Sequence, residues 1–274
     1  MTPNGHKNRT FRGITVSAEG QSERDWAVAE EVPVALIYNG TPHAVMMATP
    51  ADLKDFAIGF SLSEGIVARA EDIEEIAVSE VDAGITVNMW IAENAAAKLA
   101  DQKRTLAGRS GCGLCGIESL EQAVRPLTPI ASGPAIAVEA IRSAVSALAV
   151  QQVLNAETKS VHGAAWATPS GDLRLVREDI GRHNALDKVI GAAARAQENS
   201  ANGLLVLTSR CSYEMVQKAN MFGAPLIAAI SAPTALALDL ASQNNMTIIG
   251  IARDDAMTIF TCPDRIADRP TEES

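Results

Sequence analysis

Aromatic side chains are scarce in this chain, since Trp, Tyr and Phe together make up 4% of its 274 residues. Aliphatic residues and alanine dominate instead. That balance favours an α/β protein, with helices packed on a sheet, over an all-β sandwich. A chain of this length forms one large or two medium domains, and either arrangement buries a hydrophobic core.

Cysteine is also rare, with four residues in the whole chain. Four are too few for a disulfide scaffold in a protein of this size. Residues 1–12 are polar and lack the apolar run of a signal peptide. No apolar stretch is both long enough and free enough of charge to span a bilayer. We therefore expect a soluble cytoplasmic protein whose thiols are normally reduced.

Positive charge is in deficit, because the formal net charge is −10. This balance argues against nucleic acid or an anionic membrane as the main partner. It leaves room for a locally basic pocket that binds a small anion.

The chain is organised around residues 108–116, whose sequence is GRSGCGLCG. This stretch places Cys112 and Cys115 two residues apart and sets glycines beside both thiols. Glycine adopts backbone angles that other residues avoid, so we expect an exposed, mobile loop with accessible sulfurs. The approach to the loop is basic: Lys98, Lys103, Arg104 and Arg109. A nearby cation stabilises the thiolate, which is the form that attacks.

Three interpretations compete for Cys112 and Cys115. A structural zinc site needs about four ligands, usually two such pairs, and the chain offers one pair. A dithiol–disulfide redox pair is compatible with the spacing, but a thioredoxin-like motif normally opens a helix directly after a strand. A sulfur carrier would hold sulfur as a persulfide and pass it on. Spacing alone does not separate the last two.

The chain divides into four segments. We expect a loose N-terminus over residues 1–12, a small α+β domain over 13–125 that ends in the cysteine loop, an α/β domain over 126–266, and a loose C-terminus over 267–274. The boundary follows from the cluster Pro126, Pro129, Gly133 and Pro134.

In the first domain, Asn39-Gly40 lies between two apolar runs and predicts a tight hairpin turn. Thr49 is the expected cap of a helix with Pro50 at its first position, and Gly65 is expected to end it. The alternation of apolar residues predicts strands at 14–16, 26–28, 32–38, 44–47, 73–78 and 85–91 and a helix over 93–103.

In the second domain, strands and helices alternate. Strands are expected at 164–168, 173–176, 203–207, 226–230, 247–251 and 257–261, and helices at 138–153, 184–195, 212–222 and 234–243. This rhythm predicts a parallel sheet covered on both faces. Ligands bind beyond the carboxyl ends of the strands in such sheets, so we place a pocket at Ser209-Arg210, Ser231–Thr234 and Ala252-Arg253.

The densest polar run is Arg177-Glu-Asp-Ile-Gly-Arg-His-Asn-Ala-Leu-Asp-Lys188. Arg182, His183 and Asn184 lie at a helix entrance, where free backbone N–H groups favour an anion. The alternative is a capped helix start with an ion pair or two. His162 begins a strand and is either a donor in the pocket or a turn residue. Cys211 is either a pocket thiol or an ordinary small residue before a helix cap, and we favour the latter; for Cys262 we favour a packing role.

Read together, these stretches resemble the formate dehydrogenase accessory sulfurtransferase family (FdhD/NarQ). The similar blocks run nearly the whole length: Glu31-Val-Pro-Val, Met47-Ala-Thr-Pro50, Gly59-Phe60, Ser63-Glu-Gly65, Ser110–Gly116, Arg177–Lys188, Ser212–Lys218 and Ser231–Thr234. A lone cysteine pair is a weak signal, whereas these blocks in this order are specific.

The resemblance implies sulfur transfer from a cysteine desulfurase to the molybdenum bis(molybdopterin guanine dinucleotide) cofactor of formate dehydrogenase. In that pattern Cys112 carries the persulfide and Cys115 assists or shares it. The resemblance also implies a three-layer, cytidine-deaminase-like fold for the second domain, and a homodimer. Deaminase chemistry is not implied, because the His-x-Glu and Pro-Cys-x-x-Cys motifs of the zinc deaminases are missing.

The family's cofactor-binding segment corresponds to Ile251, Ala252, Arg253, Asp254, Asp255 and Ala256. Relatives often have glycine or a basic residue where Asp254, Asp255 and Ala256 stand, and the two carboxylates would repel a polyphosphate. We therefore expect contact through backbone N–H groups or Arg253. Arg182, His183, Asn184, His162 and Arg210 complete the expected cofactor site, and no resident metal is expected.

Two functions in other classes serve as alternatives to the sulfur carrier. A chaperone would bind and deliver the molybdenum cofactor without sulfur chemistry. A thiol–disulfide oxidoreductase would reduce disulfides through Cys112 and Cys115.

Overall fold

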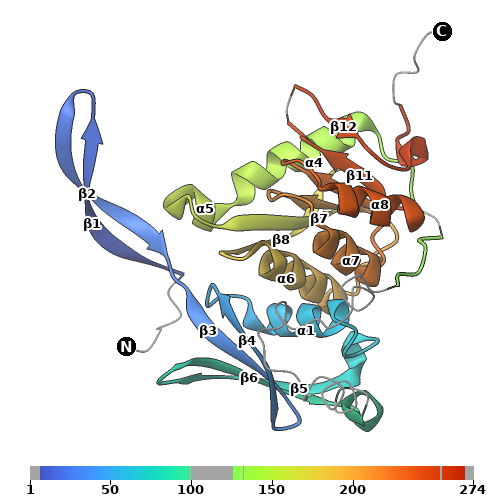
Figure 1. Ribbon diagram of the computed structural model, residues 1–274, viewed down its shortest axis with the longest axis horizontal. Helices are drawn as coiled ribbons and strands as arrows, with labels where there is room; N and C mark the ends of the chain where they lie inside the picture. Colours follow the sequence, from blue (N-terminus) through green and yellow to red (C-terminus); the bar gives the residue numbers. More distant parts are fainter. Residues whose placement is uncertain (1–6, 98, 100–125, 132, 254, 269–274) are drawn as a thin grey trace.

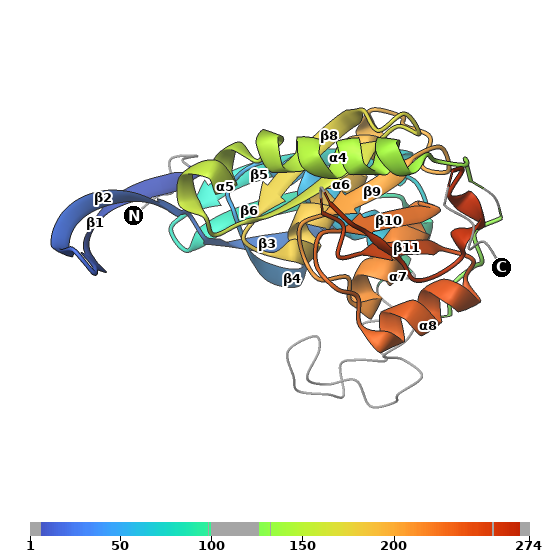
Figure 2. The ribbon, with the colours of Figure 1, turned by 90° about the horizontal axis from the view of Figure 1, so that it is seen from above.

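The computed structural model describes residues 7–97, 99, 126–131, 133–253 and 255–268. These residues form a projecting two-stranded hairpin, a four-stranded sheet and a six-stranded sheet. In Figure 1 the two sheets are separated by helices, with α1 on the smaller sheet and α6 and α7 on the larger one. Figure 2 shows α4 on the other face of the larger sheet. The mixed α/β class predicted from composition is confirmed.

The projecting hairpin consists of β1 (Asn8–Ser17) and β2 (Gly20–Ala29), paired antiparallel along their whole length. Residues 8–12 therefore do not belong to a loose N-terminus, and that part of the prediction is wrong. The start of β1 is held by an ion pair between Arg9 and Glu30. It is also held by a 2.6 Å hydrogen bond from Asn8 Nδ2 to Glu157 Oε2 of the second half.

The four-stranded sheet has the order β4-β3-β6-β5. Its strands are β3 (Val32–Tyr38), β4 (Thr41–Ala48), β5 (Ile73–Val81) and β6 (Gly84–Ile91). The Asn39-Gly40 turn is confirmed, with positive φ at both residues. One face is covered by α1 (Leu53–Ser63), and alternate residues of β3 and β6 are buried against this helix.

The start of α1 differs from the prediction. The N-cap residue is Asp52, and Thr49 caps nothing in this helix. Thr49 is fully buried, and its N–H donates to Asp179 Oδ2 at 3.0 Å while its Oγ1 accepts from Ile180 N–H at 3.2 Å. Partners far along the chain thus replace the local cap. Gly65, with φ of +66°, follows the end of the helix as expected.

The six-stranded sheet has the order β12-β11-β10-β9-β7-β8. Its strands are β7 (His162–Ala167), β8 (Leu173–Asp179), β9 (Leu204–Leu207), β10 (Leu226–Ala229), β11 (Thr247–Gly250) and β12 (Thr258–Ile259). Only β9, β10 and β11 pair in parallel, because β7 and β8 form an antiparallel hairpin and β12 returns antiparallel to β11. The prediction of a parallel sheet is therefore correct for its centre and wrong for its edges.

Helices cover both faces of this sheet. One face buries α6 (Arg182–Arg195), α7 (Tyr213–Phe222) and α8 (Ala235–Gln243), and the other buries α4 (Val138–Gln151). The alternation of β7 shows the two sides, since Trp166 lies in the first cluster and Ala165 in the second. The helix predicted over 138–153 is interrupted at Gln152, after which α5 (Val153–Thr158) follows.

Two short 3-10 turns connect longer elements: Ala70–Asp72 precedes β5, and Pro263–Arg265 precedes the C-terminal segment. Hydrogen bonds to the start of α4 hold that C-terminal segment in place. Ala267 N–H donates to Ile136 O, and Asp268 Oδ1 accepts from Val138 N–H at 2.7 Å at the start of α4. Residues 267 and 268 are therefore ordered by contacts, unlike the loose C-terminus expected there.

Each sheet lies wholly on one side of residue 126. The division into two domains at that residue stays a prediction. Residues 93–97 are helical as expected, and the remainder of the helix predicted over 93–103 lies mostly outside the described residues.

Candidate functional site

The expected pocket residues meet at one edge of the six-stranded sheet. The carboxyl ends of β9, β10 and β11 lie side by side there: Cys211 pairs with Pro233, and Ile251 N–H donates to Ser231 O at 3.3 Å. Because β7 runs antiparallel to β9, its first residue, His162, lies at the same edge. Ligands bind beyond the carboxyl ends of parallel strands in such sheets, and the pocket expected at this edge stays a prediction.

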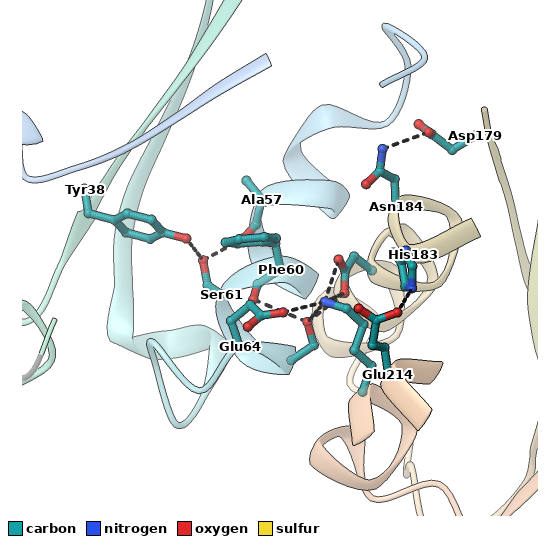
Figure 3. Close-up of polar contacts among 12 residues, drawn as sticks. Tyr38, Ala57, Phe60, Ser61, Glu64, Asp179, His183, Asn184 and Glu214 are labelled. Atoms are coloured by element: carbon teal, nitrogen blue, oxygen red, sulfur yellow. Dashed lines mark hydrogen bonds and ion pairs between the residues drawn. The ribbon is translucent and has the colours of Figure 1, made fainter. Parts of the chain in front are cut away.

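His162, Arg182 and His183 form a half-buried polar group at this edge. Burial, reinforced by the nearby Arg182 guanidinium, lowers the pKa of His162. His183 Nε2 lies 2.8 Å from Glu214 Oε2, which links the starts of α6 and α7 (Figure 3). This hydrogen bond holds the pKa of Glu214 below its ordinary value. The Glu214 carboxylate at this edge is therefore engaged by His183, while Arg182 and His162 add a cation and a largely neutral donor.

The start of α6 already has an anionic side chain beside it, the carboxylate of Asp179. The Asp179 carboxylate accepts hydrogen bonds from Gly181 N–H at 2.8 Å and from Asn184 Nδ2 at 2.9 Å. It also pairs with Lys188 Nζ at 2.7 Å, and both charged side chains are fully buried. Asn184 is buried, and its Nδ2 also donates to Met47 O at 2.8 Å. Asn184 thus joins β4 to the second half of the chain.

A second buried network lies between α1, α6 and α7 (Figure 3). Lys218 Nζ donates to Ser63 Oγ at 2.9 Å, to Glu64 Oε1 at 2.9 Å and to both Asp187 carboxylate oxygens at 3.0 Å. Ser63 Oγ donates in turn to Asp187 Oδ1 at 2.6 Å. The sequence offered no separate signal for this network, because its members come from three helices that are far apart in the chain.

A third buried ionic contact fixes the start of α1. The Asp55 carboxylate is 4% exposed and pairs with Arg177 at 2.7 Å and with Arg195 at 2.6 Å. Arg177 belongs to β8, although the sequence suggested that the strand ends at Val176. Much of the polar run 177–188 therefore binds the two halves of the chain to each other.

The segment 251–256 continues from β11 into solvent. Ala252 is buried, whereas Ile251, Arg253, Asp255 and Ala256 are exposed, and Asp254 lies outside the described residues. Arg253 N–H donates to Ala256 O at 2.9 Å and closes a turn. Arg210, after β9, is also exposed. The structure thus places Arg210 and Arg253 at neighbouring strand ends with their side chains accessible.

The two cysteines that carry the sequence argument, Cys112 and Cys115, lie outside the described residues. Of the other two, Cys211 is fully buried, and burial raises the pKa of its thiol to about 12. A thiol in that state is a poor nucleophile at neutral pH. Cys211 therefore lies in the hydrophobic core and is not an accessible pocket thiol, in agreement with the favoured interpretation. Cys262 is half-buried.

Two features are absent from the described residues, a membrane-spanning helix and a metal-ligand cluster. None of their helices combines the length and the apolar character that crossing a bilayer requires. Within the same part of the chain, no three His, Cys, Asp or Glu side chains are grouped as ligands of a metal ion.

Comparison with known proteins decides the family. The sequence model of the FdhD/NarQ family matches residues 29–267, which include the cysteine pair, the three buried ionic groups and the edge at the carboxyl ends of β9, β10 and β11, called the strand-end edge below. The chain belongs to the FdhD/NarQ family.

Relatives in the FdhD/NarQ family are similar over most of their length. The sulfur carrier protein FdhD of Cupriavidus necator is 52% identical over 239 residues, which cover 87% of this chain and 83% of the relative. The protein of the same name from Bordetella bronchiseptica is 46% identical over 256 residues, covering 93% and 92%.

A solved structure supports the same fold. A crystal structure from Desulfotalea psychrophila, of a protein described as a candidate formate dehydrogenase accessory protein, superposes with a TM-score of 0.78 at 25% identity. The match covers 96% of this chain and all of that one, so the arrangement of both sheets is shared.

Proposed function

We propose that this chain is a sulfur carrier that serves formate dehydrogenase. The observation that carries the proposal is the pair Cys112 and Cys115, set among glycines, inside a chain whose FdhD/NarQ relatives are named sulfur carrier proteins. The raised pKa of Cys211 supports the choice of Cys112 and Cys115, since the buried Cys211 thiol is unsuited to nucleophilic attack.

The proposed reaction begins with the Cys112 thiolate. It attacks the terminal sulfur of a cysteine desulfurase persulfide, an S–S bond forms at Cys112, and the desulfurase cysteine leaves as its thiolate. Cys115 assists or shares the sulfur. The terminal sulfur then passes to the metal centre of the molybdenum bis(molybdopterin guanine dinucleotide) cofactor, which is a substrate of the carrier: the S–S bond breaks, Cys112 leaves as its thiolate, and the metal centre supplies the two electrons that reduce the sulfur to sulfide. In this reading the chain is a cytoplasmic sulfurtransferase.

The strand-end edge is the proposed place for that cofactor. It offers half-buried Arg182, His183 and His162 and exposed Arg210 and Arg253 in front of the parallel strands. Cations at this position attract phosphate groups, and free N–H groups at helix starts add hydrogen-bond donors. The exposed Asp255 carboxylate opposes such contact, which favours backbone N–H groups and Arg253 within the segment 251–256.

We also infer a cytidine-deaminase-like layering for the second half. The support is the strand order β8-β7-β9-β10-β11 with helices on both faces. Pairing of two chains as a homodimer remains a proposal with the family resemblance as its support.

The decisive experiment measures the intact mass of the full chain after incubation with a cysteine desulfurase and cysteine. We expect the wild type to gain one sulfur that a reductant removes, and Cys112→Ala to gain none. Cys262→Ala is the matched control and should be loaded like the wild type. No added mass while the desulfurase turns over would contradict sulfur transfer and favour a chaperone that delivers the cofactor.

A further inference from the structure

The hairpin of β1 and β2 stands apart from the two larger sheets. Figures 1 and 2 show it reaching away from the rest of the molecule. Among the described residues, its two strands pair only with each other. At its base, Asn8 Nδ2 donates to Glu157 Oε2 of α5. A two-stranded hairpin is marginally stable at best in water, so this one needs a further surface to pack against.

One face of the hairpin, called the aromatic face below, consists of Arg9, Phe11, Arg24, Trp26 and Val28. The register brings these residues together, because Phe11 lies directly opposite Trp26 and alternate residues of a strand share a face. The Arg9 guanidinium lies over the Phe11 ring, 5.3 Å from its centre. Phe11 is 49% exposed and Trp26 is 47% exposed. The described chain thus leaves two neighbouring aromatic side chains half uncovered.

The carboxylates of the two strands lie on the opposite face. There Arg12 pairs with Asp25 at 3.2 Å and lies 3.7 Å from Glu23. Ile14 and Val16 are exposed on that face as well, toward the tip of the hairpin. The aromatic face has no carboxylate from either strand. Aromatic and arginine side chains without acidic neighbours are typical of the centre of a protein interface.

The exposed strands limit what can cover the hairpin. Unpaired strand edges and exposed aromatic side chains favour aggregation, so they need a cover whenever the chain is folded. A protein that gives or takes sulfur must be released after each transfer, and its cover would be temporary. A second copy of the chain is present at equal concentration as soon as the chain folds. A two-fold axis between two copies makes the contact reciprocal, so that both hairpins are covered at once.

We infer that the aromatic face of the hairpin is an interface between two copies of this chain, in which each copy covers the hairpin of the other. The inference rests on the homodimer proposed above and assigns its contact surface. Its size is suitable, because β1 and β2 have ten residues each. A standard interface engages roughly 20–30 residues and buries about 800 Å² on each side.

Sedimentation equilibrium of the full chain tests this interface. We expect a mass of about twice the 28.8 kDa of one chain. Trp26→Ser should raise the dissociation constant of the dimer about thirtyfold or more, the effect of truncating an aromatic anchor at the centre of an interface. Trp90→Ser is the matched control, because Trp90 of β6 is 42% exposed and lies outside the hairpin. It should associate like the wild type.

Two results of that experiment would overturn the inference. One is a wild type that stays monomeric. The other is a Trp26→Ser variant with the same dissociation constant as the wild type.

Hydrogen exchange tests the hairpin of the wild type without a substitution. Dilution below the dissociation constant should accelerate exchange at residues 8–29, because the hairpin then loses its cover. The buried strands β9, β10 and β11 should keep their protection. Phe11→Ser should exchange rapidly at residues 8–29 at concentrations where the wild type is protected, with β9, β10 and β11 unchanged. Exchange of the hairpin that is slow at every concentration would show that it is stable alone and would contradict the inference.

The same measurements separate this inference from the proposals on which it rests. They involve no sulfur, so Cys112→Ala should associate like the wild type even though it should not load sulfur. A dimer that survives both Trp26→Ser and Phe11→Ser would retain the homodimer and reject the hairpin as its interface. A monomeric wild type whose hairpin gains protection when a cysteine desulfurase is added would assign the aromatic face to that protein instead.

Discussion

Gly59 of α1 and Gly191 of α6 lie backbone against backbone where the two helices cross. A Cβ atom built on either residue would lie 2.8 Å from the backbone nitrogen of the other. It would also overlap the carbonyl oxygen of Asp187 or of Asp55. The crossing therefore needs glycine at both positions, and it brings the helix of the smaller sheet into direct contact with the helix of the larger one.

The first prediction concerns this crossing. Gly191→Ala should destabilise the protein by about 1–3 kcal/mol, because the added methyl forces the helices apart. In an open helix the same substitution stabilises by about 0.5–1 kcal/mol, so the sign of the change is diagnostic. Denaturant unfolding measures it. A stabilised Gly191→Ala variant would show that the helices are not in close contact.

The second prediction concerns Lys218 and Asp187. Lys218→Met should destabilise the protein by about 3–5 kcal/mol at neutral pH, because it leaves the buried Asp187 carboxylate without its cation. Burial raises the pKa of Asp187 and Lys218 opposes that shift, so the variant should have the higher pKa. A folded-state pKa above the unfolded value means that stability falls as pH rises above about 4.

Unfolding of Lys218→Met at several pH values measures that slope. Lys218→Met combined with Asp187→Asn should recover part of the loss and flatten the pH dependence, since no buried charge remains in that pair. Equal pH dependence in the single and double variants would argue against a charged Asp187.

The third prediction concerns the thiols. Because burial raises the pKa of Cys211 to about 12, an alkylating reagent should leave the peptide that contains Cys211 unmodified in the native protein. After denaturation the same peptide should react. Mass spectrometry of the digested protein measures both states, and rapid native labelling of Cys211 would make it a competing sulfur acceptor.

The fourth prediction concerns His162. Its pKa should lie below 6.5, because burial and the Arg182 guanidinium both disfavour the imidazolium. This group therefore opposes folding increasingly as pH falls below 6.5, where the unfolded chain binds the extra proton. Arg182→Gln should raise the pKa measured by NMR titration. No change would place Arg182 away from His162.

The sequence predicted those features that local chemistry determines. The Asn39-Gly40 turn follows from two residues that tolerate positive φ, and the apolar strands β9, β10 and β11 follow from composition and spacing. Where a residue's partners are distant, the local rule failed. Thr49 has the chemistry of a helix cap, but its N–H donates to the Asp179 carboxylate and its Oγ1 accepts from the Ile180 N–H.

In the candidate site, too, some features were predictable from the sequence and others were not. Proximity of His162, Arg182 and the strand ends was predictable, because strand direction determines which residues share an edge. The side chain of Ser212 was not: Ser212 occupies the N-cap position of α7, but its Oγ accepts no hydrogen bond from the helix. The roles of Cys112, Cys115 and the segment 251–256 stay predictions.

The contacts between the halves have a consequence for synthesis on the ribosome. Thr49 and Asp179 are 130 positions apart, and Ser63 and Lys218 are 155 apart. Chains grow from the N-terminus, so the first sheet and α1 emerge long before these partners exist. Until residue 195 has been made, Asp55 lacks its arginine partners and α1 has no complete helix to cross, and Ser63 lacks its Lys218 partner until residue 218. Final assembly of the protein is thus delayed until most of the chain has been translated.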